Sequence, residues 1–443
     1  MTATEVFEFI KTQGVLQVDI CFTDFLGLPH HVTFPIKGVD EHSLQVGFAV
    51  SGSAASGWAV GEFPNYEGWL LLVPDASTAF VDPFISCKTL VMTGNVVDCV
   101  TSQMLTFDPR GVTLRAEEYL KSSGVADLGL AATQFEYCVH RLGTAQDSLS
   151  LPRPPAPSTV NPYPDGVANA ESPPDYYLRL RTDVARIMNG CGNDIESHFH
   201  VSGTAGQCGV VKSPETLTRA ADSIVLCKYV IHNVAAQDGK RVTFRPDVES
   251  MNCVNGMHVR LSLLKQDQPL FAGDMYAGLS QLSLYYIGGL LRHARSLAAI
   301  VAPTPSSYRR LVPGYEAPVN VSYSRRERSA IVGVPMFRAS PKMRWLEFRP
   351  PDLSSNPYLA LAAIMMAGLD GVTNKIDPGE SMDNEDVYGV SAEEIKPPPQ
   401  LPTRLEEALG ALEDDQVFLL KGDVFTEQML EWYVSSKRAQ AAE

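Results

Sequence analysis

Apolar and polar positions alternate along the first hundred residues. The segment 15–35, VLQVDICFTDFLGLPHHVTFP, consists of two alternating stretches separated by a turn that contains Gly27. Because successive side chains of a strand point to opposite faces, this pattern predicts two strands with one buried face each. The segment 68–84 predicts a third strand region that prolines interrupt. The N-terminal part is therefore expected to be rich in β-structure.

Farther along the chain, helical patterns alternate with strand patterns. Residues 108–124, DPRGVTLRAEEYLKSSG, predict a helix that ends at Gly124. The apolar run YLALAAIMMAGL at 358–369 predicts a buried helix, and residues 401–415 and 425–442 predict amphipathic helices. The change of pattern places a domain boundary near residue 103, which divides the chain into residues 1–103 and residues 104–443.

Two further features of the pattern bear on organisation. The segment 153–175 is rich in Pro, Asn, Ser and Gly and predicts an exposed loop. The apolar run at 358–369 is too short to span a bilayer, and the first residues, MTATEVFEFIKTQG, show no signal-peptide pattern. We therefore expect a cytoplasmic protein without membrane contact.

Composition narrows the class of function. The formal net charge of −15 over 443 residues, without runs of Lys or Arg, argues against nucleic acid as a partner. The eight cysteines are scattered and contain no C-x-x-C motif, so we expect reduced thiols rather than a disulfide framework.

The stretch IESHFHVSGTAGQCGVV at 195–211 carries the first candidate chemistry. His198 and His200 are spaced i, i+2, so on a strand both point to one face, at a spacing that suits metal ligands. The alternative is that the two imidazoles only fill space and form hydrogen bonds with their neighbours.

Several ordered blocks give a family resemblance. The segment YRRLVPGYEAPVNVSYSRRERSA at 308–330 resembles the glutamine synthetase pattern R-L-x-P-G-Y-E-A-P-V followed by N-R-S-A. In the same order, VSGSAASGW, TQFEYCV, SHFHVSGTAGQCGV and NGMHVRLS resemble further blocks of that family, and residues 344–379 are nearly intact. The resemblance implies an α+β fold with an N-terminal β-grasp domain. It also implies a catalytic α/β domain with an antiparallel, funnel-shaped sheet, in homo-oligomeric rings of six that stack in pairs.

The family binds divalent metal ions and ATP through five glutamates and one histidine of the funnel. Position by position, the resemblance retains Glu136, His258 and Glu347 and replaces a glutamate by Gln134 and another by Gly209. A further glutamate of the H-H-E-V block falls at His200 if one residue is inserted before Thr204, or else at Ser202, and Glu196 is a third way to supply an acid. The implied metal set is Gln134, Glu136, His200, His258 and Glu347. Because imidazole suits zinc or iron better than Mg²⁺, the metal is left open among Zn, Fe, Mn and Mg.

The remaining functional positions follow from the same resemblance. The implied catalytic residues are Glu316, Arg328 and Ser51, where Ser51 replaces an aspartate that binds ammonium. The implied substrate-binding residues are Arg310, Arg349, Cys253 and His258, and the implied nucleotide-binding residues are Ser262, Arg328 and Arg344. The family's arginine of I-R-I-P is Gly333 and its lysine of T-F-M-P-K-P is Asp247, while Tyr388 matches a tyrosine that some members adenylylate.

These exchanges lead to three functional hypotheses. The first is an enzyme repurposed for a small amino-acid-like or γ-glutamyl substrate, with a His/carboxylate metal site and without glutamate–ammonia ligation. The second is an ATP-dependent γ-glutamyl amide ligase that uses an amine other than ammonia, and the third is a catalytically inactive scaffold or regulatory protein. The expected small-molecule partner is a carboxylate or amine substrate. The loss of one charged contact in the site costs about 2–4 kcal/mol of transition-state stabilisation, and several such losses fall in this site.

Overall fold

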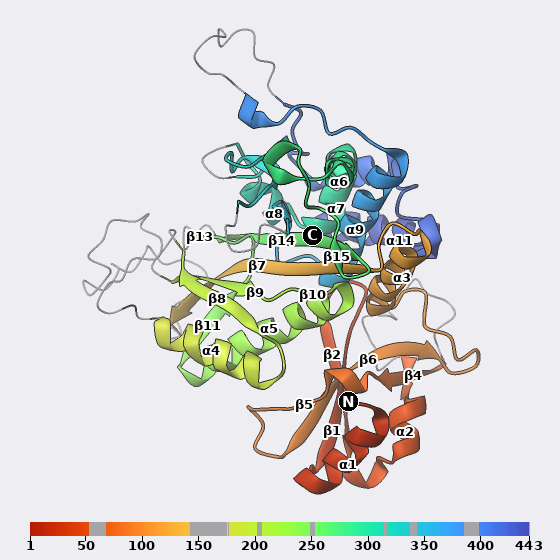
Figure 1. The fold of residues 1–443 in the computed structure, drawn as a ribbon. Helices are drawn as coiled ribbons and strands as arrows, with labels where there is room; N and C mark the ends of the chain where they lie inside the picture. Colours follow the sequence, from red (N-terminus) through yellow and green to blue (C-terminus); the bar gives the residue numbers. More distant parts are fainter. Residues whose placement is uncertain are drawn as a thin grey trace. The chain divides into compact units, whose positions relative to one another are not determined.

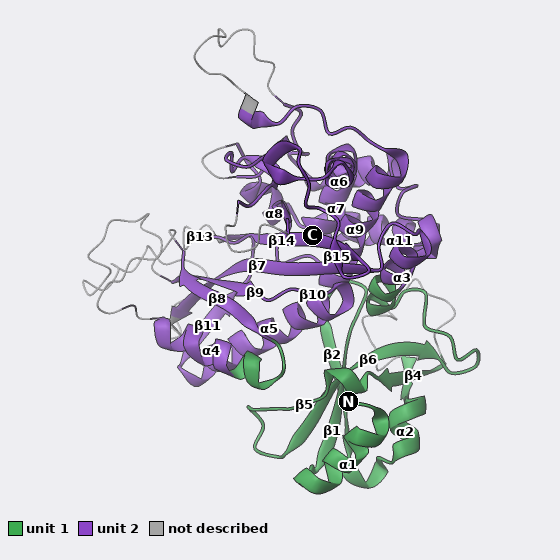
Figure 2. Cartoon of the chain, viewed as in Figure 1, with its two compact units in different colours: residues 1–114, 187–193 green, residues 115–186, 194–443 purple. Residues whose placement is uncertain are grey.

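The structure is a computed structural model that describes residues 1–52, 68–141, 175, 177–201, 206–248, 253–313, 317–336, 343–384 and 398–442. The chain divides into two compact units, residues 1–114 with 187–193 and residues 115–186 with 194–443 (Figure 2). The predicted boundary near residue 103 stays a prediction. In the described part of the chain, no helix is long and apolar enough to cross a membrane.

The first unit is built on a sheet with the strand order β2-β1-β6-β4-β3, in which β5 also pairs with β6 (Figure 1). Strands β1 and β2 pair antiparallel, and β1 and β6 pair parallel. The predicted strands of 15–35 are confirmed. The elements are α1 (Ala3–Gln13), β1 (Gln17–Thr23), β2 (Pro29–Pro35), α2 (Glu41–Val46), β3 (Phe48–Ser51), β4 (Trp69–Pro74), β5 (Phe80–Val81) and β6 (Thr89–Asp98), with 3-10 turns at Ile36–Gly38 and Ala76–Thr78.

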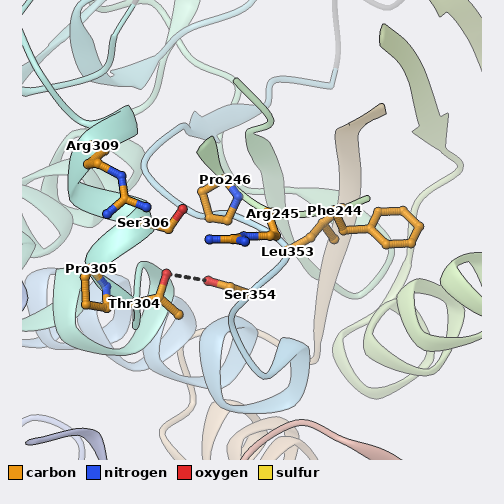
Figure 3. A pocket seen from close by; sticks show the side chains of 9 residues that line it. All are labelled: Phe244, Arg245, Pro246, Thr304, Pro305, Ser306, Arg309, Leu353 and Ser354. Atoms are coloured by element: carbon orange, nitrogen blue, oxygen red, sulfur yellow. Dashed lines mark hydrogen bonds between the residues drawn. The ribbon is translucent and has the colours of Figure 1, made fainter. Parts of the chain in front are cut away.

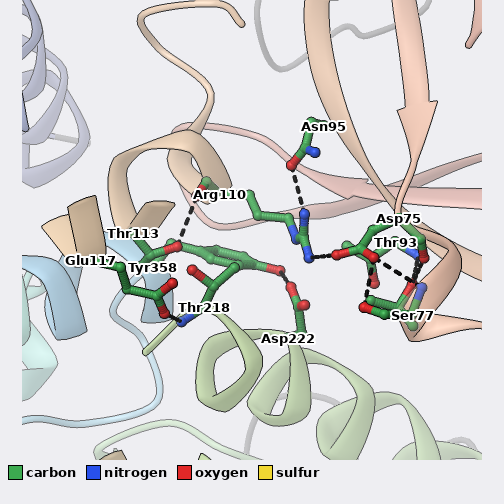
Figure 4. Close-up of polar contacts among 11 residues, drawn as sticks. Asp75, Ser77, Thr93, Asn95, Arg110, Thr113, Glu117, Thr218, Asp222 and Tyr358 are labelled. Atoms are coloured by element: carbon green, nitrogen blue, oxygen red, sulfur yellow. Dashed lines mark hydrogen bonds and ion pairs between the residues drawn. The ribbon is translucent and has the colours of Figure 1, made fainter. Parts of the chain in front are cut away.

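An ion pair ties the end of this unit together. The Arg110 guanidinium donates to the Asp75 carboxylate and to Asn95 Oδ1, both at 2.6 Å (Figure 4). Arg110 is only 3% exposed, so the pair satisfies a buried charge that would otherwise be costly. Arg110 lies in the first turn of α3 (Pro109–Ser122), which confirms the helix predicted at 108–124.

The second unit is built on a ten-stranded sheet with the order β16-β17-β18-β14-β7-β9-β8. Strands β10 and β11 also pair with β7, β15 pairs with β14, and a separate pair joins β12 to β13. All these pairs are antiparallel except β16 with β17. The strands are β7 (Leu128–Arg141), β8 (Ile195–His200), β9 (Gln207–Lys212), β10 (Glu215–Thr216), β11 (Lys240–Thr243), β12 (Asp247–Val248), β13 (Cys253–Val254), β14 (Met257–Lys265), β15 (Gln268–Pro269), β16 (Asn320–Ser324), β17 (Ala330–Gly333) and β18 (Leu346–Phe348).

Helices cover the apolar side of this sheet and pack on each other. The central helix α9 contacts α5, α6 and α7. The predicted burial of the apolar run 358–369 is confirmed, because its hydrophobic side chains are at most 2% exposed. The Tyr358 hydroxyl donates to Asp222 of α5 at 2.8 Å, and Thr218 N donates to Glu117 at 2.8 Å (Figure 4). The helices are α4 (Leu178–Gly190), α5 (Leu217–Gln237), α6 (Gln281–Arg292), α7 (Ala294–Val301), α8 (Pro305–Arg310), α9 (Pro357–Asn374), α10 (Leu405–Asp414) and α11 (Glu427–Ala442), with 3-10 turns at Tyr276–Gly278, Met382–Asn384 and Lys421–Asp423.

The helices α6 and α9 cross at glycines. A Cβ atom on Gly289 would lie 2.1 Å from the carbonyl oxygen of Ala367, and one on Gly371 would lie 2.5 Å from Gly289 N. Only residues without a side chain allow the two backbones to approach this closely. This crossing fixes α9, and with it the helical layer behind the sheet.

The cysteines depart in one respect from the expectation. Cys21, Cys87, Cys99, Cys191, Cys208 and Cys227 are free thiols. Cys138, however, is disulfide-bonded, so the expectation of reduced thiols throughout is wrong for this residue.

Candidate functional site

Side chains along β7 and β14 point alternately to the two faces of the large sheet. One face therefore packs in the core, and the other carries polar side chains. Met257, Val259, Leu261 and Leu263 are at most 1% exposed and belong to the core. The side chains of the other parity lie on the opposite face, where His258 pairs with Gln134 and Arg260 with Glu347. We call this side, which carries Gln134, Glu136, His258, Arg260 and Glu347, the polar face.

His258 lies among charged groups on the polar face. Its Nδ1 is 3.6 Å from Glu347 Oε1, and its side chain is one-third exposed. Burial lowers the pKa of His258, Glu347 opposes this, and the positive charges of Arg349, Arg310 and Arg328 lower the pKa further. His258 is therefore neutral near pH 7, in surroundings that favour an anion.

Glu347 is held in its charged form by the same neighbours. Arg349 Nε donates to Glu347 Oε1 at 2.7 Å. Burial alone would raise the pKa of Glu347, but His258, Arg349 and Arg260 outweigh it and lower the pKa. The carboxylate is thus already paired with a guanidinium.

Glu136 is also engaged by its own chain. Its Oε2 accepts from Gln207 Nε2 and from the backbone N–H of Gly256, both at 3.3 Å. Its charge acts on Arg310, which places these two residues in one electrostatic environment. The predicted residues Glu136, His258, Arg310, Arg328, Glu347 and Arg349 are therefore brought together.

The hairpin of β8 and β9 presents apolar groups to the polar face. Gly209 pairs with Glu136 on one side and with Phe199 on the other, so all three share this face. A Cβ atom on Gly209 would lie 2.5 Å from Phe199 Cζ, which means that the aromatic ring fills the space of the missing side chain. Val201 N donates to Gln207 O at 3.1 Å, so Val201 has the same parity as Phe199.

The prediction that His200 joins Glu136 and His258 is wrong. His198 pairs with Val210 and His200 with Cys208, whose side chains are fully buried on the other face. The i, i+2 spacing did place both histidines on one face, but the register makes it the core face. Without an insertion, the glutamate of the H-H-E-V block falls at Val201.

The two histidines instead border a buried polar group beside α4. Burial is the main cause that lowers the pKa of His198 and of His200, and both sense the charges of Asp175 and Arg181. Arg181 Nη2 donates to Asp175 Oδ2 at 2.5 Å, and Arg181 is 2% exposed. Neutral imidazoles next to this ion pair fit the alternative of space-filling interior residues, although the buried Nδ1 of His198 has no hydrogen-bond partner in the described part of the chain.

Arg310 is anchored at the end of α8. It is 6% exposed, and its Nη2 donates to the carbonyl oxygens of Pro350 and Pro351. The fully buried Asp352 faces it, and burial raises the pKa of Asp352 although Arg310 opposes this. A Cβ atom on Gly256 would lie 3.1 Å from Arg310 Nη1, so Gly256 leaves room for the guanidinium.

The exchange at Gly333 has a structural counterpart. Gly333 pairs with Glu347, and a Cβ atom there would lie 2.3 Å from Arg349 Nη2. The Arg349 guanidinium therefore occupies the space of a side chain at position 333. Its Nη1 also donates to the carbonyl oxygen of Glu327 at 2.9 Å, which orients it.

One ion pair on the polar face was missed by the sequence reasoning. Arg260 Nη2 donates to Glu196 Oε2 at 2.7 Å, and the Arg260 side chain is 10% exposed. A β-bulge between Ile195 and Ser197 leaves Glu196 without a paired position, which lets it reach this face. The signal was the arginine in NGMHVRLS, where the family pattern G-M-H-x-H-x-S has a histidine.

The other predicted residues are placed as follows. Ser262 is fully buried, and its hydroxyl has no hydrogen-bond partner in the described part of the chain. Arg344 Nε donates to the carbonyl oxygen of Gly278 at 3.3 Å. Ser51 ends β3 of the first unit, where it pairs with Trp69. Cys253 pairs with Val248, Asp247 accepts from Arg309, and Glu316, Ser202 and Tyr388 lie outside the described residues.

The donors present do not fit the metal sites that the resemblance implies. Among the described residues, no three His, Cys, Asp or Glu side chains are grouped so that they could hold a metal ion. Around Glu136 the expected acids are Gly209 and Val201, and Phe199 covers that place. A hard divalent cation needs several oxygen ligands, which this end of the polar face does not offer.

Comparison with known proteins covers the whole chain. Residues 14–99 match the family described as "Glutamine synthetase, beta-Grasp domain", and residues 106–443 match "Glutamine synthetase, catalytic domain". The glutamine synthetase of Aquifex aeolicus is 41% identical over 455 residues, covering 100% of this chain and 96% of that protein. That of Salmonella typhimurium is 39% identical, covering 99% and 96%.

Solved structures resemble the fold. A cryo-EM structure of Plasmodium falciparum glutamine synthetase superposes with a TM-score of 0.86 at 22% identity, covering 99% of this chain and 96% of that one. A structure titled "Apo GmaS without ligand" superposes with a TM-score of 0.81 at 25% identity, with the same coverage.

Proposed function

This chain belongs to the glutamine synthetase family, and from that premise we propose that it accepts a small amino-acid-like or γ-glutamyl carboxylate on the polar face, without the family's ligation of glutamate and ammonia. The expected β-grasp domain and glutamine synthetase catalytic domain are confirmed. The proposal concerns which part of the family's chemistry these residues support.

The positive charges of Arg310, Arg328 and Arg349, which all act on a neutral His258, carry the proposal. Guanidinium groups bind carboxylates through two parallel hydrogen bonds, at roughly twice the strength of neutral hydrogen bonds. The neutral His258 imidazole has one nitrogen that accepts a hydrogen bond from an ammonium group. Together these groups match the two charged ends of an amino acid.

The same surroundings disfavour a metal-and-ATP step. The nearby carboxylates are committed, Glu347 to Arg349 and Glu136 to Gln207 and Gly256. Positive charges close by repel a divalent cation unless acids outnumber them. We therefore route no step through a metal ion or a nucleotide, although the family implies both.

The test is binding of L-glutamate and of γ-glutamyl amides to the full chain by calorimetry, without metal and without ATP. We expect saturable binding that weakens about tenfold in Arg328→Gln, because one charge-assisted contact is worth about 1.5–3 kcal/mol. Arg328 is exposed, so its substitution leaves the core intact. Arg326→Gln, an exposed neighbour, is the matched control and should bind like the parent.

A second measurement separates the alternatives. The parent protein, given Mg²⁺-ATP, L-glutamate and ammonia, should release no ADP above background. ADP release that ammonia or another amine stimulates would support the ATP-dependent ligase, which the retained His258, Glu347 and Arg328 favour. Absence of binding by every glutamate-like ligand would leave the inactive scaffold.

A further inference from the structure

A cavity of about 460 Å³ lies in the second unit, and none of the residues that define the polar face lines it. Three segments line it, as Figure 3 shows: the chain after β11, the start of α8 and the chain before α9. The lining residues are Phe244, Arg245, Pro246, Thr304, Pro305, Ser306, Arg309, Leu353 and Ser354. Its volume falls in the range of about 300–1,000 Å³ that small-molecule sites occupy.

The cavity combines a positive charge with hydroxyl groups. Arg245 is exposed, and within the described chain its guanidinium has neither a hydrogen bond nor an ion pair. Arg309 Nε donates to Asp247 Oδ2 at 2.8 Å, which fixes the second guanidinium at the wall. Thr304 and Ser354 lie with their hydroxyl oxygens 3.5 Å apart, and Figure 3 draws this contact below Arg245. Beside these two arginines the described residues place one carboxylate, that of Asp247, on Arg309.

The rest of the wall is apolar. Pro246, Pro305 and Leu353 lie beside the arginines and hydroxyls, whereas the Phe244 ring points away from them (Figure 3) and packs against His232 and Tyr137. Leu353 is only 4% exposed, so it forms a fixed surface. A ligand that fills the cavity must therefore present an apolar body to Pro246, Pro305 and Leu353 and an anionic group to Arg245.

We propose that this cavity binds a small organic anion, with a phosphate or carboxylate head on Arg245 and an apolar body against Pro246, Pro305 and Leu353. The fork of the guanidinium suits both heads, because each offers two oxygens in one plane. The hydroxyls of Ser306 and Ser354 donate to the Asp247 carbonyl oxygen and to Asp352 Oδ1, so the Arg245 guanidinium supplies the donors for the head group.

The site is separate from the polar face although both touch α8. Arg309 reaches the cavity, whereas Arg310 is buried and donates to the carbonyl oxygens of Pro350 and Pro351. Arg309 and Arg310, which are successive residues of the short helix α8, thus lie at two different sites. A ligand of the cavity is consequently not expected to compete with one on the polar face.

The experiment is a calorimetric titration of the full chain with phenyl phosphate, benzoate and inorganic phosphate. We expect phenyl phosphate or benzoate to bind at least about tenfold more tightly than inorganic phosphate, since only they fill the apolar part. The tighter of the two identifies the head group. Saturating L-glutamate should leave this binding unchanged, and competition between them would overturn the proposal of a second site.

Substitutions locate the site. Arg245→Gln should weaken the phenyl phosphate or benzoate affinity about tenfold, and Arg245→Lys should fall between it and the parent, because lysine keeps the charge but not the fork. Arg292→Gln, at another exposed arginine, should change the affinity less than about twofold. Equal affinities of Arg245→Gln and the parent, or no binding up to about 10 mM, would overturn the proposal.

Discussion

At the residue scale, Gly209 and Phe199 act as a pair. The phenyl ring stands where a side chain at position 209 would begin, with 2.5 Å between Phe199 Cζ and the Cβ position. The loss of an acid and the presence of an aromatic ring are therefore one packing arrangement. Restoring the acid alone cannot restore a metal site.

A substitution tests this pairing. We expect Gly209→Glu to lower the free energy of unfolding by about 1–3 kcal/mol, because overpacking forces the ring or the strand to move. Phe199→Ala added to it should recover part of the loss by opening space. Urea unfolding measures both variants, and Gly410→Ala, where a Cβ meets nothing within 4 Å, is the control. A Gly209→Glu variant as stable as the parent would contradict the pairing.

The candidate site could be predicted from single residues only in part. Family blocks located His258, Glu347 and Glu136, which strand alternation carries onto the polar face, and also Arg310 at the end of α8 and Arg349 directly after β18. The face of His200 could not be predicted, since the period of a strand says which residues share a face but not which face it is. That depends on the register of β8 with β9, which is a tertiary property.

At the scale of elements, one imidazole joins several helices. His293 lies between α6 and α7, and its ring nitrogens contact Asp370 of α9 at 3.1 Å and Asp415 at the end of α10 at 2.8 Å. The ring stacks on Phe418 with 3.9 Å between centroids. Burial would lower the pKa of His293, but the hydrogen bonds with both aspartates outweigh it and raise the pKa.

This arrangement predicts how stability depends on pH. Because the folded-state pKa of His293 is raised, its contribution is complete below the usual pKa of about 6.5 and is lost as pH rises through the folded value. Asp370, whose pKa the His293 hydrogen bond lowers, loses its contribution as pH falls through its own folded value. In urea unfolding across pH 5 to 9, His293→Gln should lack the loss at high pH. The exposed His42→Gln should keep it, and identical pH profiles for His293→Gln and the parent would rule out this role.

Several long elements followed from periodicity, whereas the longest helix, α5, the longest strand, β7, and the shortest strands were not predicted individually. The helices at 108–124 and 358–369 and the strands of 15–35 are found as α3, α9, β1 and β2. The two-residue strands β5 and β10 carry no period of their own and form because longer partners pair with them. The helix α9 runs beyond the predicted apolar run to Asn374, and it ends where Lys375 adopts a left-handed backbone conformation.

At the scale of the whole molecule, the family resemblance predicted both units and their strand-rich and mixed character. Pattern alone does not supply this, since pairings such as β14 with β7 join segments more than a hundred residues apart. We propose, as the resemblance implies, that the chain assembles into rings of six that stack in pairs.

Light scattering after size exclusion tests the assembly. Six or twelve copies of the 48.3-kDa chain are expected at micromolar concentration. Dilution should leave the mass unchanged, because closed rings bury every copy of the interface. A monomeric mass would contradict the proposed assembly into rings. It would not bear on the ligand sites that are proposed in the second unit.

Along β14, residues that face the core alternate with residues that belong to the polar face. The two sets of residues can therefore change independently. His258 and Arg260 interleave with Met257, Val259 and Leu261, so side chains of the polar face alternate with core side chains along one strand. Selection for a stable fold then leaves the first set open to drift, while ligand selection leaves the second set alone. Substitutions on the polar face can in this way change the chemistry of the sheet while the core residues keep their packing, as the Phe199 ring beside Gly209 illustrates.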